Sequence, residues 1–188
     1  AIDVCKKAQR NYDLNKTISE DDLETLIYVA TNSPSKQNET HFSLRVYTDP
    51  DIIRQIYKRT ELFTFQTNLQ TDKIFTDTEN KFITDHRYSV TNSQILANAV
   101  FVYCDETRNI RSGTHIVATK PNATKLAKDT LLEQKNMSIG ISSGQLVMAA
   151  ALLGYKTGYC SAFERSGDSV QKVLKLESEP KLLVGVGY

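Results

Sequence analysis

The sequence lacks the signals of several large classes of protein. No apolar run approaches the ~20 residues that cross a bilayer, since the best candidate, residues 146–153, is far too short. No charged segment followed by an apolar one opens the chain, as it would in a signal peptide. The net charge of +1 gives no global electrostatic case for nucleic acid or an acidic surface. We therefore expect neither a membrane nor a nucleic acid as a partner.

Motifs of common enzyme classes are also missing. There is no Gly-x-Gly-x-x-Gly and no P-loop, so a Rossmann nicotinamide domain is not supported. There is no Ser-His-Asp, Cys-His or carboxylate-pair signature. The three histidines, His41, His86 and His115, are scattered and do not make a metal site. We expect a structural role or plain exposure for His41 and assign no role to the other two.

The cysteines are few and widely spaced. Cys5, Cys104 and Cys160 are odd in number and lack Cys-x-x-Cys spacing, which argues against a disulfide framework and against a cysteine metal site. Cys104 ends an apolar run, and Cys160 lies in a strand-like segment. We expect buried, reduced thiols, which fit a reducing compartment and a cytoplasmic location.

The 188 residues, 40% hydrophobic and 24% charged, are typical of one globular domain over residues 1–188. The order of helical and strand-like patterns predicts an α+β fold, a mixed β-sheet flanked by helices. Two unpatterned segments, 61–90 and 105–122, are read as a lid, an insert or short helices around a pocket. The predicted helices are 2–10, 19–32, a short one from Pro50, 124–153 with a break near Asn136 and Gly140, and 169–176; the predicted strands are 42–47, 99–103, 157–163 and 182–186.

Three segments, in this order, carry a family resemblance. Residues 6–13 (KKAQRNYD) resemble the Arg-Arg-Ser-x-Arg-x-Phe-Asp segment of the FMN-dependent nitroreductases. Residues 33–42 (SPSKQNETHF) are similar to that family's Pro-Ser-Ser-x-Asn-x-Gln-Pro-Trp segment. Residues 140–155 (GISSGQLVMAAALLGY) resemble its long central helix, which ends at an Ala-x-x-x-Gly stop. The resemblance spans nearly the whole chain and implies a nitroreductase-like fold.

The resemblance also implies an FMN site built from four parts of the chain. In the family, the matching residues contact the flavin phosphate and ribityl chain, the ring, its pyrimidine edge and the surroundings of N5. At the pyrimidine edge, either Thr91 or Asn92 holds the first role and Gln94 the second. The implied cofactor-binding residues are Lys6, Lys7, Arg10, Pro34, Ser35, Lys36, Asn38, Thr91, Asn92, Gln94, Ser161 and Ala162.

The chemistry of these residues agrees with the assignment in part. Lys6, Lys7 and Arg10 put three cations within about one helical turn, either as a solvated helix end or as a grip on phosphate. Two of them are lysines where the family has arginines, and Ala8 replaces a serine. Lysine keeps the charge but loses the bidentate geometry of arginine. The pair at 161–162 stands where the family often has Glu-Gly or Gly-Gly.

The implied activity is that of an FMN-dependent oxidoreductase. NAD(P)H would deliver a hydride to flavin N5 and be replaced by a small acceptor such as a nitroaromatic or a quinone, in a ping-pong sequence that needs no catalytic side chain. The resemblance implies a homodimer with FMN between the subunits, and the apolar helix 141–153 is a candidate interface. Two alternatives stay open: a degenerate member that binds flavin or serves a structural role, and a specialised member that dehalogenates or modifies flavin.

Overall fold

The computed structural model describes residues 1–35, 38, 40–60, 63–64, 89–90, 92–105, 123–163 and 169–188. Lys36 and Thr91, two residues assigned to the cofactor, lie outside the described residues. Nearly all of the two segments 61–90 and 105–122, read above as a lid or insert, lies outside them as well.

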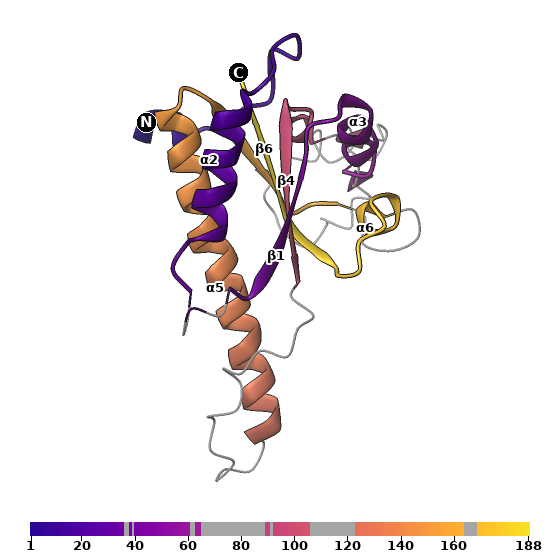
Figure 1. Cartoon of the computed structure of the whole chain (residues 1–188). Coiled ribbons are helices and arrows are strands. Elements are labelled where there is room, and N and C mark those ends of the chain that lie inside the picture. The colour runs from indigo at the N-terminus through magenta and orange to yellow at the C-terminus, as the bar shows by residue number, and fades with distance from the viewer. Residues whose placement is uncertain are drawn as a thin grey trace, which may run out of the picture.

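Four strands form the central sheet in the order β1 (Phe42–Tyr47), β4 (Ala99–Asp105), β6 (Pro180–Gly187) and β5 (Lys156–Cys160) (Figure 1). The predicted α+β fold with flanking helices is confirmed, but the sheet is antiparallel where we expected a mixed one. β4 and β5 run in the same direction, as a strand–helix–strand order suggests. Because β6 lies between them, each described pairing in the sheet is antiparallel. A separate short ladder pairs β2 (Phe63–Thr64) with β3 (Ser89–Val90).

Helices cover both faces of the sheet (Figure 1). One layer contains α2 (Glu20–Thr31) and α5 (Ala123–Leu152), with α1 (Ile2–Cys5) beside α5. The other layer contains α3 (Pro50–Lys58), α6 (Val170–Val173) and the 3-10 helix η3 (Ser93–Ile95). Within the described residues, none of these helices combines the length and the apolar character needed to cross a bilayer.

Local signals start and stop the longer helices. Ser19 caps α2, because its Oγ accepts a hydrogen bond from the N–H of Asp22 at 3.2 Å. Asp49 caps α3 by accepting from the N–H of Asp51 at 2.8 Å. Gly154 follows α5 with φ of 91°, the left-handed conformation that favours glycine at this position. The N-cap predicted at Ser19 and the C-terminal glycine predicted at Gly154 are confirmed.

Other limits of the elements differ from the prediction, among them the end of β5, which is Cys160 where we expected residue 163. The first helix ends at Cys5 rather than at residue 10, because the backbone N–H of Gln9 bonds a carbonyl of β5 at 2.8 Å instead of continuing a helix. α6 covers 170–173 only, and Lys175 beyond it has φ of 51°. The break expected near Gly140 does not occur, and α5 is continuous.

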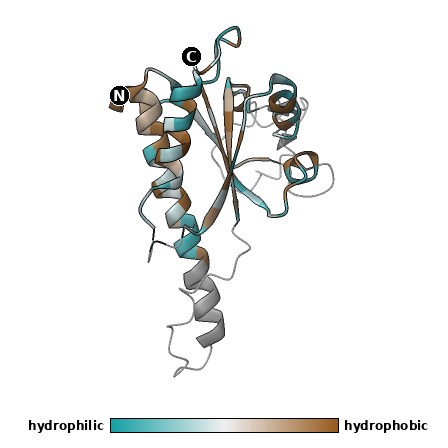
Figure 2. Cartoon of the chain, in the orientation of Figure 1, coloured by the Kyte–Doolittle hydropathy of each residue, from teal (hydrophilic) through white to brown (hydrophobic). Residues whose placement is uncertain are grey.

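β4 is buried on both faces, as its continuous apolar sequence predicts. Alternate side chains reach opposite cores, and Figure 2 shows hydrophobic residues concentrated on the central strands and on the helix sides that face them. Toward α2 and α5, β4 contributes Ala99, Phe101 and Tyr103. Toward α3 and α6, it contributes Val100, Val102 and Cys104.

The buried thiols are inert. Cys104 and Cys160 are buried as predicted, whereas Cys5 is half-buried. Burial raises the pKa of both the Cys104 and the Cys160 thiol to about 11. Both are therefore neutral at neutral pH and cannot act as thiolate nucleophiles.

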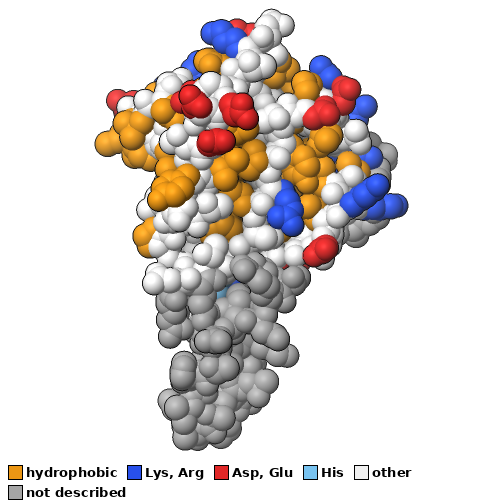
Figure 3. All heavy atoms as spheres, in the orientation of Figure 1, with side chains coloured by type: hydrophobic (Ala, Val, Ile, Leu, Met, Phe, Trp, Pro, Cys, Tyr) orange, Lys and Arg blue, Asp and Glu red, His pale blue; other side chains and the backbone are white. Residues whose placement is uncertain are grey.

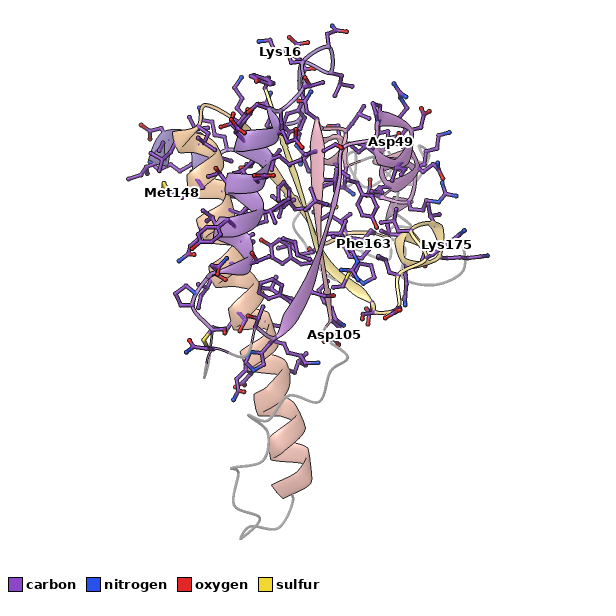
Figure 4. The ribbon with its side chains drawn as sticks, viewed as in Figure 1. Lys16, Asp49, Asp105, Met148, Phe163 and Lys175 are labelled. Atoms are coloured by element: carbon purple, nitrogen blue, oxygen red, sulfur yellow. The ribbon has the colours of Figure 1, made fainter. Side chains whose placement is uncertain are left out.

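An ion pair fixes α5 to the end of the sheet. Asp105 ends β4 and lies beside α5 (Figure 4). Lys135 of α5 donates to its Oδ1 at 2.6 Å, and only 17% of the Lys135 side chain is exposed. Lys181 of β6 lies 4.0 Å from the other carboxylate oxygen. Asp105 thus joins a helix and two strands at this end of the sheet.

Candidate functional site

The N-terminal segment that follows α1 is hydrogen-bonded to β5, to β6 and to the last residue of the chain. Gln9 donates its backbone N–H to the carbonyl of Thr157 at 2.8 Å. The Tyr12 hydroxyl donates to the carbonyl of Gly185 at 3.3 Å, and Tyr12 is buried. Asp13 donates its N–H to the carbonyl of Tyr188 at 3.2 Å. These bonds place Arg10, which lies between them in sequence, at the edge formed by β5.

Arg10 is the outer end of a hydrogen-bonded network that joins four segments. Its Nη1 donates to Oε1 of Gln94 at 3.0 Å. Nε2 of Gln94 donates to the Tyr159 carbonyl and to Oδ1 of Asn92, both at 3.1 Å. Nδ2 of Asn92 in turn donates to the carbonyls of Thr60 and Ala162, at 2.6 and 3.1 Å. The structure thus brings together four of the residues assigned to the cofactor, which are Arg10, Asn92, Gln94 and Ala162.

Exposure divides this network into an outer and an inner part. Arg10 and Ser161 are exposed, and Asn92 and Ala162 are half-buried. Gln94 is 5% exposed. The amide hydrogens of Asn92 and Gln94 are used within the protein, so these two amides offer no free donor to a flavin edge. The side chain best placed to meet an external anion here is Arg10.

Two glycines make room for Gln94. A Cβ at Gly158 would lie 2.5 Å from Cβ of Gln94, and a Cβ at Gly185 would lie 2.1 Å from the Gln94 backbone oxygen. Both distances are far below an ordinary carbon contact of about 3.5–4.0 Å. Only glycine at 158 and 185 allows η3 to pack this closely on β5 and β6.

The two lysines assigned to the phosphate stay at the surface. Lys6 and Lys7 are exposed, and Nζ of Lys6 lies 3.1 Å from Oδ1 of Asp3. An exposed pair of this kind contributes little to stability. Both lysines follow α1 directly and add positive charge to the segment that leads to Arg10.

The other assigned segment forms a tight turn after α2. Oγ of Ser35 accepts from the N–H of Thr40 at 3.0 Å, and the N–H of Asn38 donates to the Ser35 carbonyl at 3.2 Å. Asn38 is exposed and has φ of 56°, which Asn tolerates better than most residues. A cavity of about 420 Å³ lies between this turn and α5; it is lined by Pro34, Ser35, Glu133, Gln134, Met137, Ser138 and Ile141.

α5 forms one wall of this cavity with both polar and apolar side chains. Ser138 donates to the Gln134 carbonyl at 2.8 Å, and its Oγ lies 3.3 Å from Nδ1 of His41. His41 is fully buried, in a structural position against α5. Gln134 is 9% exposed, and its Oε1 has no hydrogen-bond partner among the described residues. Sequence reasoning missed Gln134, because a glutamine inside a helical pattern carries no signal that it is buried.

The two groups of assigned residues lie at opposite edges of the sheet. The turn at 34–40 leads into β1, whereas Arg10 and Gln94 contact β5, and β1 and β5 are the two edge strands. Three interstrand spacings separate these strands, roughly 14 Å. In the part of the chain that is described, no group of three or more His, Cys, Asp or Glu side chains could hold a metal ion.

Comparison with known proteins gives one family and several similar folds. The model of the Nitroreductase family matches residues 6–188. No curated protein matches the sequence. A putative NAD(P)H:FMN oxidoreductase from Staphylococcus epidermidis has a TM-score of 0.64 at 15% identity, with 99% of this chain and 85% of that one covered.

Two further solved structures are similar at the same level. A BluB-like flavoprotein from Clostridium difficile has a TM-score of 0.64 at 18% identity, over 99% of this chain and 88% of that one. NfrA1 from B. megaterium has a TM-score of 0.64 at 15% identity over 99% of this chain, which spans only 65% of the length of NfrA1. At such identities the likeness shows a shared fold.

Proposed function

The chain belongs to the nitroreductase family, and from that membership we propose that it is an NAD(P)H-dependent flavin oxidoreductase. When bound, FMN would take a hydride from NAD(P)H at N5 and pass it to a small acceptor such as a nitroaromatic or a quinone. The similar structure from Staphylococcus epidermidis, described as a putative NAD(P)H:FMN oxidoreductase, supports this class of activity. The protein's own residues would bind, orient and shield the cofactor.

The observation that carries the proposal is the position of Arg10. Arg10 is an exposed residue, yet one of its guanidinium nitrogens lies 3.0 Å from the oxygen of a buried amide. A guanidinium presents five N–H donors in a planar fork that matches the oxygens of a phosphate. Lys6 and Lys7 add two exposed positive charges to the same segment. This donor set fits the phosphate of FMN.

We further propose that two copies of the chain complete the site. The turn with Pro34 and Ser35 and the network with Arg10 and Gln94 lie at opposite edges of one sheet. A partner subunit that presents its own Pro34–Ser35 turn to the Arg10 edge would bring both groups to one flavin. A single copy in sedimentation at micromolar concentration would contradict this arrangement.

The outer side of α5 is suited to hold such a partner. Met137 and Leu152 are 63% and 73% exposed, and Met148 points away from the sheet (Figure 4). Figure 3 shows hydrophobic side chains at the surface over α2 and α5. A second helix could approach closely, because a Cβ at Gly140 or Gly144 would have nothing within 4 Å. One stripe at helical spacing is formed by Met137, Gly140, Ile141, Gly144, Met148 and Leu152.

Substitution of Arg10 tests the assignment of the phosphate site. Arg10→Ala should weaken FMN binding by about 1.5–3 kcal/mol, since a hydrogen bond to a charged group contributes that much. FMN fluorescence quenching measures the affinity. Arg54→Ala is a control, because Arg54 is also exposed but pairs with Asp51 on α3. Equal FMN affinity in both variants would refute the assignment.

Anaerobic reduction tests the activity. The protein with FMN bound should lose its visible flavin bands when NADPH or NADH is added. Bands that persist with either donor would favour a protein that binds flavin without turning it over.

A further inference from the structure

A second cavity lies at the opposite end of β1 from the turn at 34–40. It has a volume of about 130 Å³ and is lined by residues from three segments, 14–17 in the N-terminal segment, 48–54 at the start of α3 and 96–98 after η3. Lys16 and Asp49, from two of these segments, lie at the end of the molecule away from Asp105 (Figure 4). β1 is 6 residues long, so its ends are roughly 17 Å apart. Of the described residues assigned to the cofactor, none lines this cavity.

Hydrogen bonds hold one wall of the cavity in place. Nδ2 of Asn98 donates to the carbonyls of Asp13 and Lys16, at 2.9 and 2.6 Å, and its Oδ1 accepts from the N–H of Tyr188 at 3.2 Å. Glycine at 187 leaves the space that this amide needs, because a Cβ at Gly187 would collide with Oδ1 of Asn98. The opposite wall is the capped start of α3. The cavity is thus formed before a ligand arrives, which lowers the cost of ordering on binding.

The most deeply buried residues of the lining are apolar. Ile53 and Ala97 are 2% and 3% exposed, and Leu96 is half-buried. An engineered apolar cavity of about 150 Å³ holds one benzene molecule. At about 130 Å³, this cavity has room for a hydrocarbon body of about four to six carbons.

The charged residues of the lining are both cations. Lys16 and Arg54 come from opposite walls, and their side chains are 56% and 57% exposed. Each lies near a carboxylate outside the lining: Nζ of Lys16 is 3.9 Å from Asp13, and Nη1 of Arg54 is 2.7 Å from Asp51. Nζ of Lys16 also lies 4.8 Å from the centre of the Tyr188 ring. Exposed ion pairs of this kind contribute little, so both cations can turn to a ligand.

We propose that this cavity binds a small monocarboxylate with a hydrocarbon body of about four to six carbons. The body lies on Ile53 and Ala97, and the carboxylate lies at the rim between Lys16 and Arg54. Hydroxyls of the exposed residues Thr17 and Thr48 add donors at the same rim. This site is separate from the one proposed for the flavin and does not depend on the proposed function.

The test follows isoleucine methyl groups by NMR while hexanoate is added to the whole chain with FMN present. Ile53 lines this cavity and Ile141 lines the cavity of about 420 Å³, so the two methyl signals report the two places separately. The Ile53 signal should shift with a millimolar dissociation constant, as expected for a ligand of about eight non-hydrogen atoms. Acetate, which lacks the hydrocarbon body, should bind more than about tenfold more weakly.

Two comparisons test the role of charge. Hexan-1-ol has the same body without the carboxylate and should bind more weakly than hexanoate. Lys16→Gln removes one cation from the rim and should weaken hexanoate binding about fivefold, as expected for a charged contact at a partly exposed site. Lys58→Gln is the matched control, because Lys58 is an exposed lysine of α3 that does not line the cavity. It should bind hexanoate like the wild type.

Several results would overturn the proposal. They are an Ile53 signal that does not move, a shift confined to Ile141, equal affinity for hexanoate and hexan-1-ol, and equal affinity of the two lysine variants for hexanoate. A protein that binds no flavin would instead overturn the proposed function, and the hexanoate titration would still decide this inference.

Discussion

The contact between Gly158 and Gln94 allows a sharp test of how the candidate site is held together. An added methyl group in Gly158→Ala would lie 2.5 Å from Cβ of Gln94, 2.8 Å from the backbone oxygen of Gln9 and 3.2 Å from the Tyr12 hydroxyl. The first two neighbours are a Cβ and a main-chain atom, so neither can move without moving backbone. To restore an ordinary carbon contact, β5 and η3 must separate by about 1 Å.

The expected cost follows from that displacement. Overpacking of this kind costs about 1–3 kcal/mol of unfolding free energy. The same movement carries Gln94 away from Arg10 and stretches their 3.0 Å hydrogen bond. Gly158→Ala should therefore lose stability and, in addition, bind FMN about tenfold more weakly, as the loss of a bond to a charged group predicts.

Gly154→Ala is the matched control. Gly154 has φ of 91°, a conformation that strains an alanine, but an added Cβ there meets nothing within 4 Å. Its cost is about 1–2 kcal/mol through backbone strain alone. Urea unfolding and FMN titration should show two variants of similar stability, only one of which binds FMN weakly. Wild-type FMN affinity in Gly158→Ala, or equal loss in both variants, would refute the reasoning.

Three further predictions concern stability and assembly. Burial raises the pKa of the Cys104 and Cys160 thiols to about 11, so the unfolded thiols lose their protons first and stability is lost as pH rises from about 9 to 11. In urea unfolding across this range, the drop in unfolding free energy should be smaller in Cys104→Val than in the wild type by up to about 2–3 kcal/mol, because the variant retains only the Cys160 thiol. Met148→Asp puts a charge on the outer stripe of α5 and should shift the proposed dimer toward monomer in sedimentation, whereas Gln55→Asp, at an exposed site on α3 in the opposite helix layer, should not. Gln134→Leu removes a buried oxygen without a partner among the described residues and should raise the unfolding free energy by about 1 kcal/mol; a lower free energy would mean that the oxygen is satisfied in solution.

Sequence reasoning succeeded where the signal is local. The N-cap at Ser19 and the stop at Gly154 depend on residues within one turn of the helix end, and both are found in the structure. The burial of β4 on both faces follows from an unbroken apolar run. The family resemblance, carried by three segments in the right order, is confirmed by a match over residues 6–188.

Sequence reasoning failed where contacts between distant parts of the chain determine the structure. The first helix stops at Cys5 because Gln9 bonds to a strand some 150 residues later in the sequence, and no local pattern records that bond. The sheet is antiparallel because β6, the last strand in sequence, inserts between β4 and β5. The bond between Arg10 and Gln94 spans 84 positions. The available clue was Gly158 and Gly185, since an isolated glycine in a strand often marks a close backbone approach.

Lys6 and Lys7 stand where the family has arginines, and these substitutions make the network around Arg10 more important for binding a phosphate. Lysine at positions 6 and 7 supplies attraction at long range, but a flexible ammonium fixes neither the angle nor the register of a phosphate. Among the three cations of this segment, only Arg10 can present a planar fork, so the geometry of binding depends on one side chain. An exposed arginine is ordinarily mobile, and a hydrogen bond from a surface arginine to a flexible partner would do little to restrain it. Here the partner is a buried amide whose own orientation is dictated by Asn92 and by backbone carbonyls. The orientation of Arg10 at the surface is thus set by buried residues, whose polar atoms are hydrogen-bonded within the protein.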